Sequence, residues 1–161
     1  MEYRHKINLQ GKDITLTWVG QITAAPARVY ALAFVSKQEL LLVSGGTNDP
    51  YRWLPGGGVE PGETPEQALR RELLEEADAL IAALEYLGSQ RLDDGEGWHE
   101  YQHFYWCHVI LTSQAPVRAE STIRHLVSTA HFLDMLEWGY SDPKAAMLLE
   151  RALECERKYH E

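Results

Sequence analysis

The sequence predicts a mixed α/β sandwich, and three observations support that prediction. Apolar stretches rich in β-branched residues, typical of strands, precede residue 60 and recur after residue 100. A segment with a helical apolar stripe lies between them, and a second helical segment follows the last strands. Strands on both sides of a central helix indicate helices layered against a sheet. The 161 residues can bury a sizeable core, so we predict a single domain over residues 1–161.

The N-terminal part predicts two strand pairs. Residues 5–19 alternate around a Gln-Gly-Lys-Asp turn and predict a hairpin. Residues 28–35 and 39–43 are almost continuously apolar, which is typical of strands in a buried sheet. We expect a turn-rich loop over residues 44–50 and a short strand over residues 51–54 to follow.

The central helix has a clear start. Thr64 is a natural N-cap, Pro65 suits the first helical position, and Gln67 completes a capping box. An apolar stripe then recurs at spacings of four, four and three residues, formed by Leu69, Leu73, Ala77 and Leu80. This stripe predicts one face of the helix packed in the core.

The second half predicts a loop, two strands and a last helix. Residues 91–100 are polar and contain glycines, which favours a loop, and residues 101–111 are rich in aromatic and β-branched residues, which favours a strand. Residues 123–133 predict another strand, running into a short helical stretch near Leu136. Ser141 or Asp142 is expected to cap a last helix that has Pro143 in its first turn and runs to about Lys158.

Composition limits the partners. The formal net charge of −9 disfavours long nucleic acids, which need a basic surface, but it disfavours a small phosphorylated ligand less, since bound cations can reverse the local sign. The N-terminus is polar and leads into no apolar stretch, and no apolar run reaches the roughly 18 residues that a membrane span needs. We therefore expect a cytoplasmic protein without a membrane span, with Cys107 and Cys155 as reduced thiols.

Three acids on the central helix predict a metal site. Glu72, Glu75 and Glu76 are three and four residues apart, so they project from nearly one face, where they repel one another unless neutralised. Ala68, one turn earlier, leaves room beside them. Hard oxygen ligands next to open space suit Mg²⁺ or Mn²⁺. The alternative is a solvated acidic face, which is the usual meaning of an isolated Glu-Glu run.

Residues 57–79, GGVEPGETPEQALRRELLEEADA, resemble the Nudix box and favour the metal site over the solvated face. Seven positions of the box are matched in register, namely Gly57, Glu63, Arg71, Glu72, Leu73, Glu75 and Glu76. So many matches arise by chance in about 10⁻⁵ of chains or fewer. Asp78 stands where the box usually has Gly, a change that a left-handed Asp accommodates at modest cost. We expect this to alter the helix end, which leaves open a helix running on through Leu80, and to spare the acids.

The resemblance implies the α/β/α sandwich of the Nudix family, with a mixed β-sheet, and a hydrolase that cuts a diphosphate linkage. It implies that Mg²⁺, for which Mn²⁺ can substitute, is held by Glu72, Glu75 and Glu76 with the carbonyl of Gly57. Such ions would bridge substrate oxygens, activate a water and stabilise the leaving phosphate. Arg71 is then expected to pair with Glu63 and to orient the junction of loop and helix.

The general base and the substrate contacts are less defined. The resemblance implies Glu75 or Glu72 as the base, with a glutamate from a later loop, Glu120 or Glu100, as the alternative. Trp98 in its polar loop and Arg52 near a strand end are candidate substrate contacts, as is Glu120. A zinc site is not expected among the histidines of residues 99–108, because they have no acidic or cysteine partner at a defined metal spacing.

The leading functional hypothesis is a Mg²⁺-dependent pyrophosphohydrolase acting on a nucleoside diphosphate derivative: a nucleotide, a nucleotide sugar or an ADP-ribose-like compound. A nucleotide-sensing module without turnover is one alternative, although a pure binding role does not need all the carboxylates. An RNA-end pyrophosphohydrolase is another, which the negative charge disfavours. The resemblance is also compatible with a homodimer.

Overall fold

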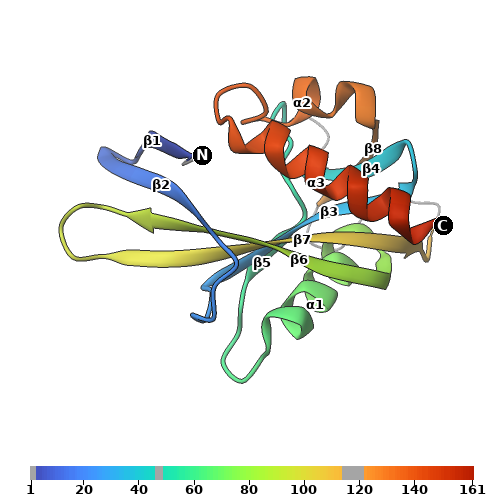
Figure 1. The fold of residues 1–161 in the computed structure, drawn as a ribbon, viewed down its shortest axis with the longest axis horizontal. Coiled ribbons are helices and arrows are strands. Elements are labelled where there is room, and N and C mark those ends of the chain that lie inside the picture. Colours follow the sequence, from blue (N-terminus) through green and yellow to red (C-terminus); the bar gives the residue numbers. More distant parts are fainter. Residues whose placement is uncertain (1–2, 46–48, 114–121) are drawn as a thin grey trace.

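The computed structural model describes residues 3–45, 49–113 and 122–161, which form a mixed sheet flanked by helices (Figure 1). The strand order is β1-β2-β6-β7-β3-β4-β8, with β5 paired to β3 off this path. β3 and β7 run parallel, whereas the other neighbouring strands run antiparallel. The predicted α/β class with a mixed sheet is confirmed.

The elements have the following bounds. The strands are β1 (Arg4–Leu9), β2 (Lys12–Gly20), β3 (Arg28–Ser36), β4 (Glu39–Ser44), β5 (Gly56–Gly58), β6 (Ala79–Asp93), β7 (His99–Leu111) and β8 (Ile123–Ser128). The helices are α1 (Pro65–Ala77), the 3₁₀ turn η1 (Thr129–His131), α2 (Phe132–Met135) and α3 (Lys144–Tyr159).

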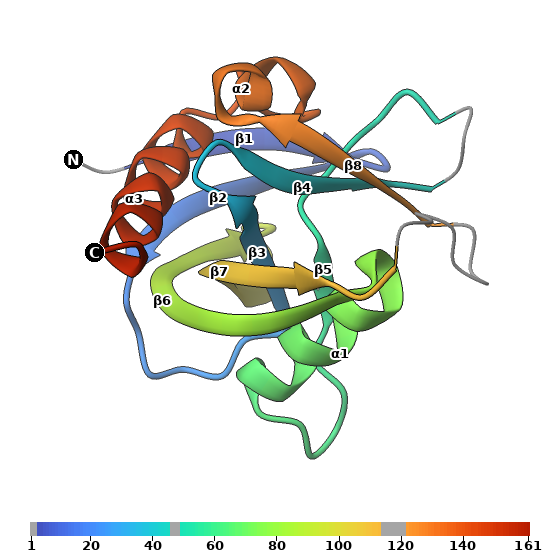
Figure 2. The same ribbon diagram turned by 90° about the vertical axis from the view of Figure 1, so that its right-hand side faces the viewer.

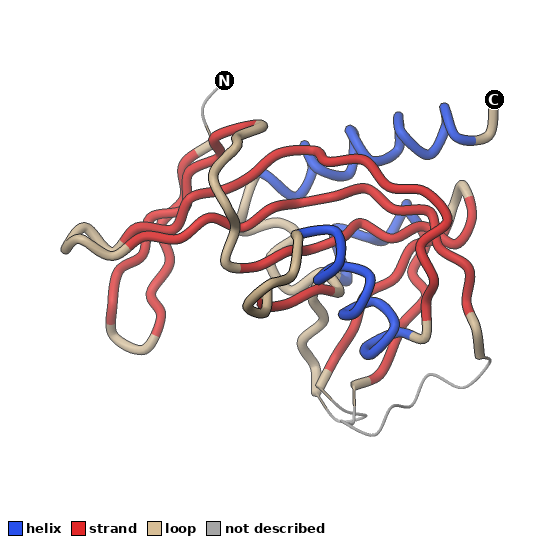
Figure 3. The backbone as a smooth tube through the Cα atoms, turned by 90° about the horizontal axis from the view of Figure 1, so that it is seen from below, coloured by secondary structure: helices blue, strands red, loops and turns tan. Residues whose placement is uncertain are grey.

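The two faces of the sheet carry different helices, as Figures 1 and 2 show. β7 has alternating side chains, so Phe104 and Trp106 belong to the core beneath α3, while Tyr105 and Cys107 belong to the core beneath α1. The apolar stripe of α1 is buried in the second core through Leu69, Leu73 and Ala77, as its spacing predicts. The long β6–β7 hairpin extends beyond both helices (Figure 3).

The sequence does not predict strand β6. It leaves open instead that the helix continues through Leu80. The helix instead ends at Ala77, where Asp78 adopts the left-handed conformation with φ 51°. Leu80 lies in β6 and is 51% exposed, so it is not part of the helical stripe. The register of β6 against β7 shifts between Ile81 and Ala83 and again between Tyr86 and Gly88. Such bulges break the two-residue alternation by which a strand is recognised.

Other boundaries also differ from the expectations. Residues 51–54 form only an isolated bridge between Trp53 and Val43, and the strand near them is β5, because the chain pairs with β3 only after Pro55. The loop expected over residues 91–100 is shorter, since β6 and β7 both extend into it. The strand expected over residues 123–133 ends at Ser128, where η1 and α2 begin. Residues 46–48 of the predicted loop lie outside the described residues.

The hairpin of β1 and β2, the buried strands β3 and β4, and helix α3 are confirmed. The N-cap predicted at Ser141 or Asp142 is wrong, because Pro143 is the N-cap of α3 and provides no side-chain cap. Asp142, one residue earlier, accepts a hydrogen bond through Oδ1 from the Lys144 backbone N at 3.0 Å. Cys107 and Cys155 are free thiols. In the residues that the structure describes, no helix is both long and apolar enough to cross a membrane.

Candidate functional site

The loop before α1 is held against β3 by close backbone contact. β5 pairs antiparallel with β3, with Val29 opposite Gly57. Gly56 has φ 144°, and a Cβ added there would lie 2.0 Å from the Val29 carbonyl oxygen, so only glycine fits. The loop then enters α1 through the predicted capping box, in which Thr64 and Gln67 exchange hydrogen bonds of 3.1 and 2.9 Å.

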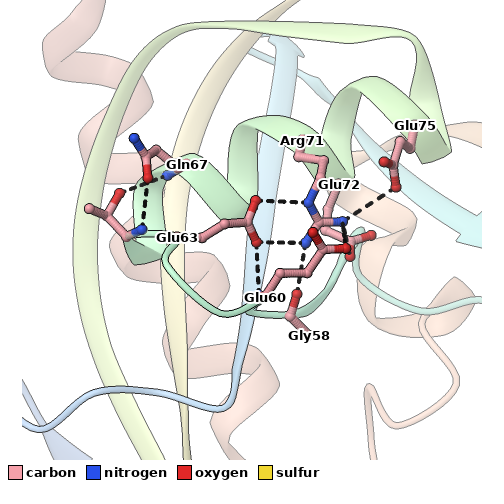
Figure 4. Close-up of polar contacts among 8 residues, drawn as sticks. Gly58, Glu60, Glu63, Gln67, Arg71, Glu72 and Glu75 are labelled. Atoms are coloured by element: carbon pink, nitrogen blue, oxygen red, sulfur yellow. Dashed lines mark hydrogen bonds and ion pairs between the residues drawn. The ribbon is translucent and has the colours of Figure 1, made fainter.

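Arg71 is the centre of the polar contacts between this loop and α1 (Figure 4). Its Nε and Nη2 each donate to one carboxylate oxygen of Glu63, both at 2.9 Å. Nη2 also donates to the Gly58 carbonyl at 2.9 Å, and Nη1 donates to Glu72 Oε1 at 3.0 Å. The pairing of Arg71 with Glu63 that the sequence implies is therefore present, and the same guanidinium also reaches Glu72.

Gly57 and Glu72 form the tightest approach between the loop and the helix. A Cβ added at Gly57 would lie 2.7 Å from Glu72 Oε1, closer than such contacts allow. The absence of a side chain at Gly57 therefore lets the backbone of the loop lie against the carboxylate of Glu72.

Glu76 is held in an environment that disfavours its negative charge. Its Oε1 accepts a hydrogen bond from the Gly56 backbone N at 2.8 Å. Desolvation by burial outweighs this bond and raises the pKa of Glu76 to about 8, and the neighbouring carboxylate of Glu72 raises it further. Burial likewise raises the pKa of Glu72, whereas the hydrogen bond from Arg71 lowers the pKa of Glu63.

These acids fit a divalent cation. Glu72 and Glu76 are carboxylates with raised pKa values. Arg71 donates to Glu72, but the same guanidinium is also paired with Glu63. A cation would neutralise the negative charges of these two partly buried acids. Glu75, one turn from Arg71 with an Nη1–Oε2 distance of 3.4 Å, is 46% exposed and leaves room for water and phosphate as further ligands.

A cavity of about 420 Å³ lies on the α3 side of the sheet, where Phe104 lines it, and its lining also includes Tyr30 and Leu54 near the loop that leads into α1. Among its lining residues are the aromatic side chains of Tyr30, Trp53 and Trp138 and the amides of Gln90 and Gln102. Tyr30 links the cavity to the box, because it is paired with Gly56 in the sheet and the backbone N of Gly56 donates to Glu76 Oε1 at 2.8 Å. The cavity combines flat apolar surfaces with a few polar groups, as binding sites for small molecules do.

Comparison with known proteins decides the family, because the chain matches the NUDIX domain family over residues 25–149. The chain belongs to the Nudix family. As a Nudix protein it is a hydrolase that acts on pyrophosphate bonds, and hydrolases of this family generally use a divalent metal such as Mg²⁺.

Two solved structures share the fold of this Nudix protein. The Bacillus subtilis pyrophosphohydrolase BsRppH, as its E68A mutant, has 22% sequence identity and a TM-score of 0.69, covering 94% of this chain and 97% of that chain. A MutT protein, from work on Aliivibrio salmonicida and Vibrio cholerae, has 22% identity and a TM-score of 0.57, covering 80% of this chain and 99% of that chain. The match over most of both chains places the eight strands in a Nudix fold.

The candidate substrate residues are more scattered in this Nudix protein than the box. Trp98 is 44% exposed in the turn between β6 and β7, and it does not line the cavity. Figure 1 shows that this turn lies away from α1. Arg52 lies near His125. Burial is the main cause of the lowered pKa of His125, and the charge of Arg52 lowers that pKa further. Glu100 is close enough to Tyr30 to raise its pKa, so it faces the same region as Glu76. Glu120 lies outside the described residues.

Sequence reasoning missed the residues that line the cavity. Gln90 and Gln102 come from β6 and β7, and Tyr30, Trp53 and Trp138 come from separate parts of the chain. Gln90 meets Gln102 through the pairing of β6 with β7, and the sequence does not predict β6 as a strand. The available signal is Gln102, a glutamine within a stretch of aromatic residues, since a buried amide needs a specific partner.

Proposed function

We propose that the chain is a Mg²⁺-dependent pyrophosphohydrolase that cleaves the diphosphate linkage of a nucleoside diphosphate derivative. The observation that supports it is a cavity of aromatic and amide side chains that includes Tyr30, since Tyr30 pairs with Gly56 and the backbone N of Gly56 donates to Glu76. A nucleoside in the cavity would direct its diphosphate toward the carboxylates. We further propose that the single domain spans residues 1–161.

The metal would be held by Glu72, Glu75 and Glu76, together with the carbonyl of Gly57. When bound, Mg²⁺ supplies charge neutralisation for the phosphates and activation of the attacking water. The burial of Glu72 and Glu76 supports this role, because acids with raised pKa values gain most from a nearby cation.

Arg71 and Glu63 would act as positioning residues. The bidentate ion pair fixes the guanidinium, and the guanidinium in turn fixes the Gly58 carbonyl and Glu72. A planar, bidentate ion pair restricts the orientation of both side chains more than a single hydrogen bond does. The backbone of the loop and the carboxylate of Glu72 are thereby oriented before substrate arrives.

Glu75 is our choice for the group that accepts a proton from the attacking water. Its carboxylate is 46% exposed, so water reaches it, whereas the Glu72 side chain is 15% exposed and accepts from Arg71 at 3.0 Å. Glu100 is the alternative, because it lies near Tyr30 on the cavity side. The proton passes to a carboxylate oxygen, water oxygen bonds to phosphorus, and the P–O bond to the leaving phosphate breaks.

Base recognition would use Trp53 or Trp138 as a stacking surface and the Gln90–Gln102 pair as a polar reader. Gln90 Nε2 donates to Gln102 Oε1 at 2.9 Å, while Gln90 Oε1 is buried and has no hydrogen-bond partner among the described residues. An unpaired buried acceptor is unfavourable, and an N–H group of a base would satisfy it. We prefer Trp53 and Trp138 to Trp98 for this role, because they line the cavity and Trp98 does not.

The test is a release assay for phosphate and nucleotide with Mg²⁺ or Mn²⁺ over matched compounds. Nucleoside triphosphates, nucleotide sugars and ADP-ribose form one arm, and inorganic pyrophosphate, which lacks a base, forms the control arm. The proposal expects turnover of at least one nucleoside compound and much weaker turnover of pyrophosphate. Binding without turnover would favour the sensing module, and turnover confined to a 5′-triphosphorylated oligoribonucleotide would favour RNA ends. Sedimentation of the same preparation tests the predicted homodimer.

A further inference from the structure

A second group of metal-ligating side chains lies outside the box, between β7 and the last turns of α3. It consists of His108, Glu156 and His160, with one potential ligand atom from each, all within 4.8 Å of one another. His108 comes from β7, whereas Glu156 and His160 are four residues apart and belong to α3 and its C-cap. The C-terminal end of α3 lies over this end of β7 (Figure 1).

The carboxylate of Glu156 is the centre of this group. His108 Nδ1 lies 2.9 Å from Glu156 Oε2, and His160 Nε2 lies 2.5 Å from the same oxygen. Trp106 Nε1 donates to Glu156 Oε1 at 3.1 Å and fixes the other side of the carboxylate. Tyr159 packs on the His108 ring at a centroid distance of 4.5 Å, so the imidazole is also oriented.

The charge of Glu156 has unusual partners. Glu156 is 1% exposed, and in the described part of the chain its ion-pair partners are His108 and His160, not lysine or arginine. An imidazole balances a carboxylate only when it is protonated, whereas a bound cation balances it while both imidazoles stay neutral. A buried carboxylate requires such a partner, because an unpaired charge in the interior is strongly unfavourable.

We propose that His108, Glu156 and His160 bind a transition-metal ion, Zn²⁺ by preference. Two imidazoles and one carboxylate form an N₂O ligand set that suits zinc, and a water would complete a tetrahedron. The N–O separations would have to widen to about 3.3 Å to admit the ion at the usual bond lengths of ~2.0–2.2 Å. His160 can move in this way, since its side chain is 30% exposed at the end of α3.

This site is separate from the box acids. His108 lies on the face of β7 beneath α3, as Trp106 does, and α1 packs on the opposite face. Along that face, His108 is six residues from Gln102 in the cavity, or about 20 Å at the rise of a strand. In the sequence, His99, His103 and His108 have no acidic or cysteine partner at a defined metal spacing. The fold supplies the missing partners from α3.

The test uses the full chain, stripped of metal with a chelator and then held in millimolar Mg²⁺ to saturate the box acids, which prefer a hard ion. Zn²⁺ is titrated in competition with a chromophoric chelator, and Co²⁺ is followed by its visible absorption. We expect one Zn²⁺ per chain, a tetrahedral Co²⁺ spectrum, and a rise of Tm with Zn²⁺. His160→Gln should weaken Zn²⁺ binding about tenfold or more and abolish the rise of Tm.

His131→Gln is the matched control, because His131 is exposed and also lies near one carboxylate, that of Asp134. It should bind Zn²⁺ as the unaltered chain does. Absence of Zn²⁺ binding in Mg²⁺ would overturn the proposal and leave a network of hydrogen bonds only. Equal Zn²⁺ binding by His160→Gln would also overturn it, as would loss of binding in Glu72→Gln, which would place the ion in the box.

Discussion

Arg71 and Glu63 form a bidentate ion pair, with both N–O distances at 2.9 Å, across the junction of α1 and the loop that precedes it. The remaining donors of the same guanidinium reach the Gly58 carbonyl and Glu72. One planar group therefore ties together the loop backbone, an acid of the loop and an acid of the helix. The local order of the candidate site depends on this geometry and not on charge alone.

Replacing Arg71 by Lys keeps the positive charge and removes the bidentate guanidinium. The variant therefore separates the contribution of geometry from that of charge. We expect Arg71→Lys to lower kcat about 10- to 100-fold, as loss of a supporting partner does at metal sites. Steady-state kinetics at saturating Mg²⁺ measure the effect. Arg70→Lys is the control, since Arg70 donates from an exposed side chain to the Ile81 carbonyl at 3.3 Å. Equal kinetics for the two variants would show that turnover does not need the bidentate guanidinium of Arg71.

Gly57 and Gly58 provide a matched pair of substitutions. A Cβ at Gly57 would lie 2.7 Å from Glu72 Oε1, whereas a Cβ at Gly58 meets nothing within 4 Å. Gly57→Ala must therefore displace Glu72 or the loop, and a displacement near 1 Å costs about a hundredfold in rate. We expect Gly57→Ala to weaken Mg²⁺ activation and lower kcat, with Gly58→Ala close to the unaltered protein. Similar Mg²⁺ titrations for both variants would contradict this account of the loop.

The cavity makes a prediction about Trp138. Removing a stacking surface costs about 1–3 kcal/mol per base, so Trp138→Ala should raise KM for a nucleoside substrate about tenfold with little change in kcat. Trp98→Ala, at the exposed hairpin tip, should leave KM unaltered. The comparison is made on whichever nucleoside compound the release assay identifies. A higher KM in Trp98→Ala alone would move base recognition to the hairpin.

The sequence predicts the box more completely than the fold around it. Its acids, capping box and Arg71–Glu63 pair follow from short-range spacing, which a helix converts directly into contacts. The long strand β6 was missed because two bulges break its alternation and because Asp78, a non-glycine residue, ends the helix in a left-handed conformation. Comparison with the box predicts a left-handed Asp78, but it does not predict the strand of fifteen residues that follows.

The sequence does not predict sites that are assembled from distant elements. Gln90 meets Gln102 only through the register of β6 on β7, and His108 meets Glu156 only where α3 crosses that strand. No spacing in the sequence encodes either contact. They follow from the pairing of strands and the packing of a helix, which are tertiary properties.

His103 provides a test of pH dependence in the core beside α1. Burial lowers the pKa of His103 below its ordinary value of 6.5, and its ring stacks on Tyr86 at 4.7 Å. Below pH 6.5 the unfolded chain therefore binds a proton that the folded chain resists, so the free energy of unfolding falls as pH falls from 6.5 through the folded pKa. We expect His103→Phe, which keeps an aromatic ring, to show a smaller fall between pH 6.5 and 5 in urea titrations.

His125, whose pKa burial also lowers, contributes to the slope in both proteins and serves as the internal reference. The prediction therefore concerns the difference between the two slopes. Parallel curves over that pH range would show that His103 takes up its proton as readily in the folded state as in the unfolded chain.

The most direct test of the central claim compares Glu72→Gln with Glu66→Gln. Both glutamates belong to α1, but Glu66 lies exposed in its first turn, outside the acids of the box. The amide keeps the shape of the side chain and removes a charged metal ligand. In the release assay with Mg²⁺, we predict that Glu72→Gln loses about a hundredfold or more in kcat while keeping its unfolding transition, and that Glu66→Gln retains full turnover. Near-normal Mg²⁺-dependent turnover by Glu72→Gln would contradict the assignment of the box as the catalytic metal site.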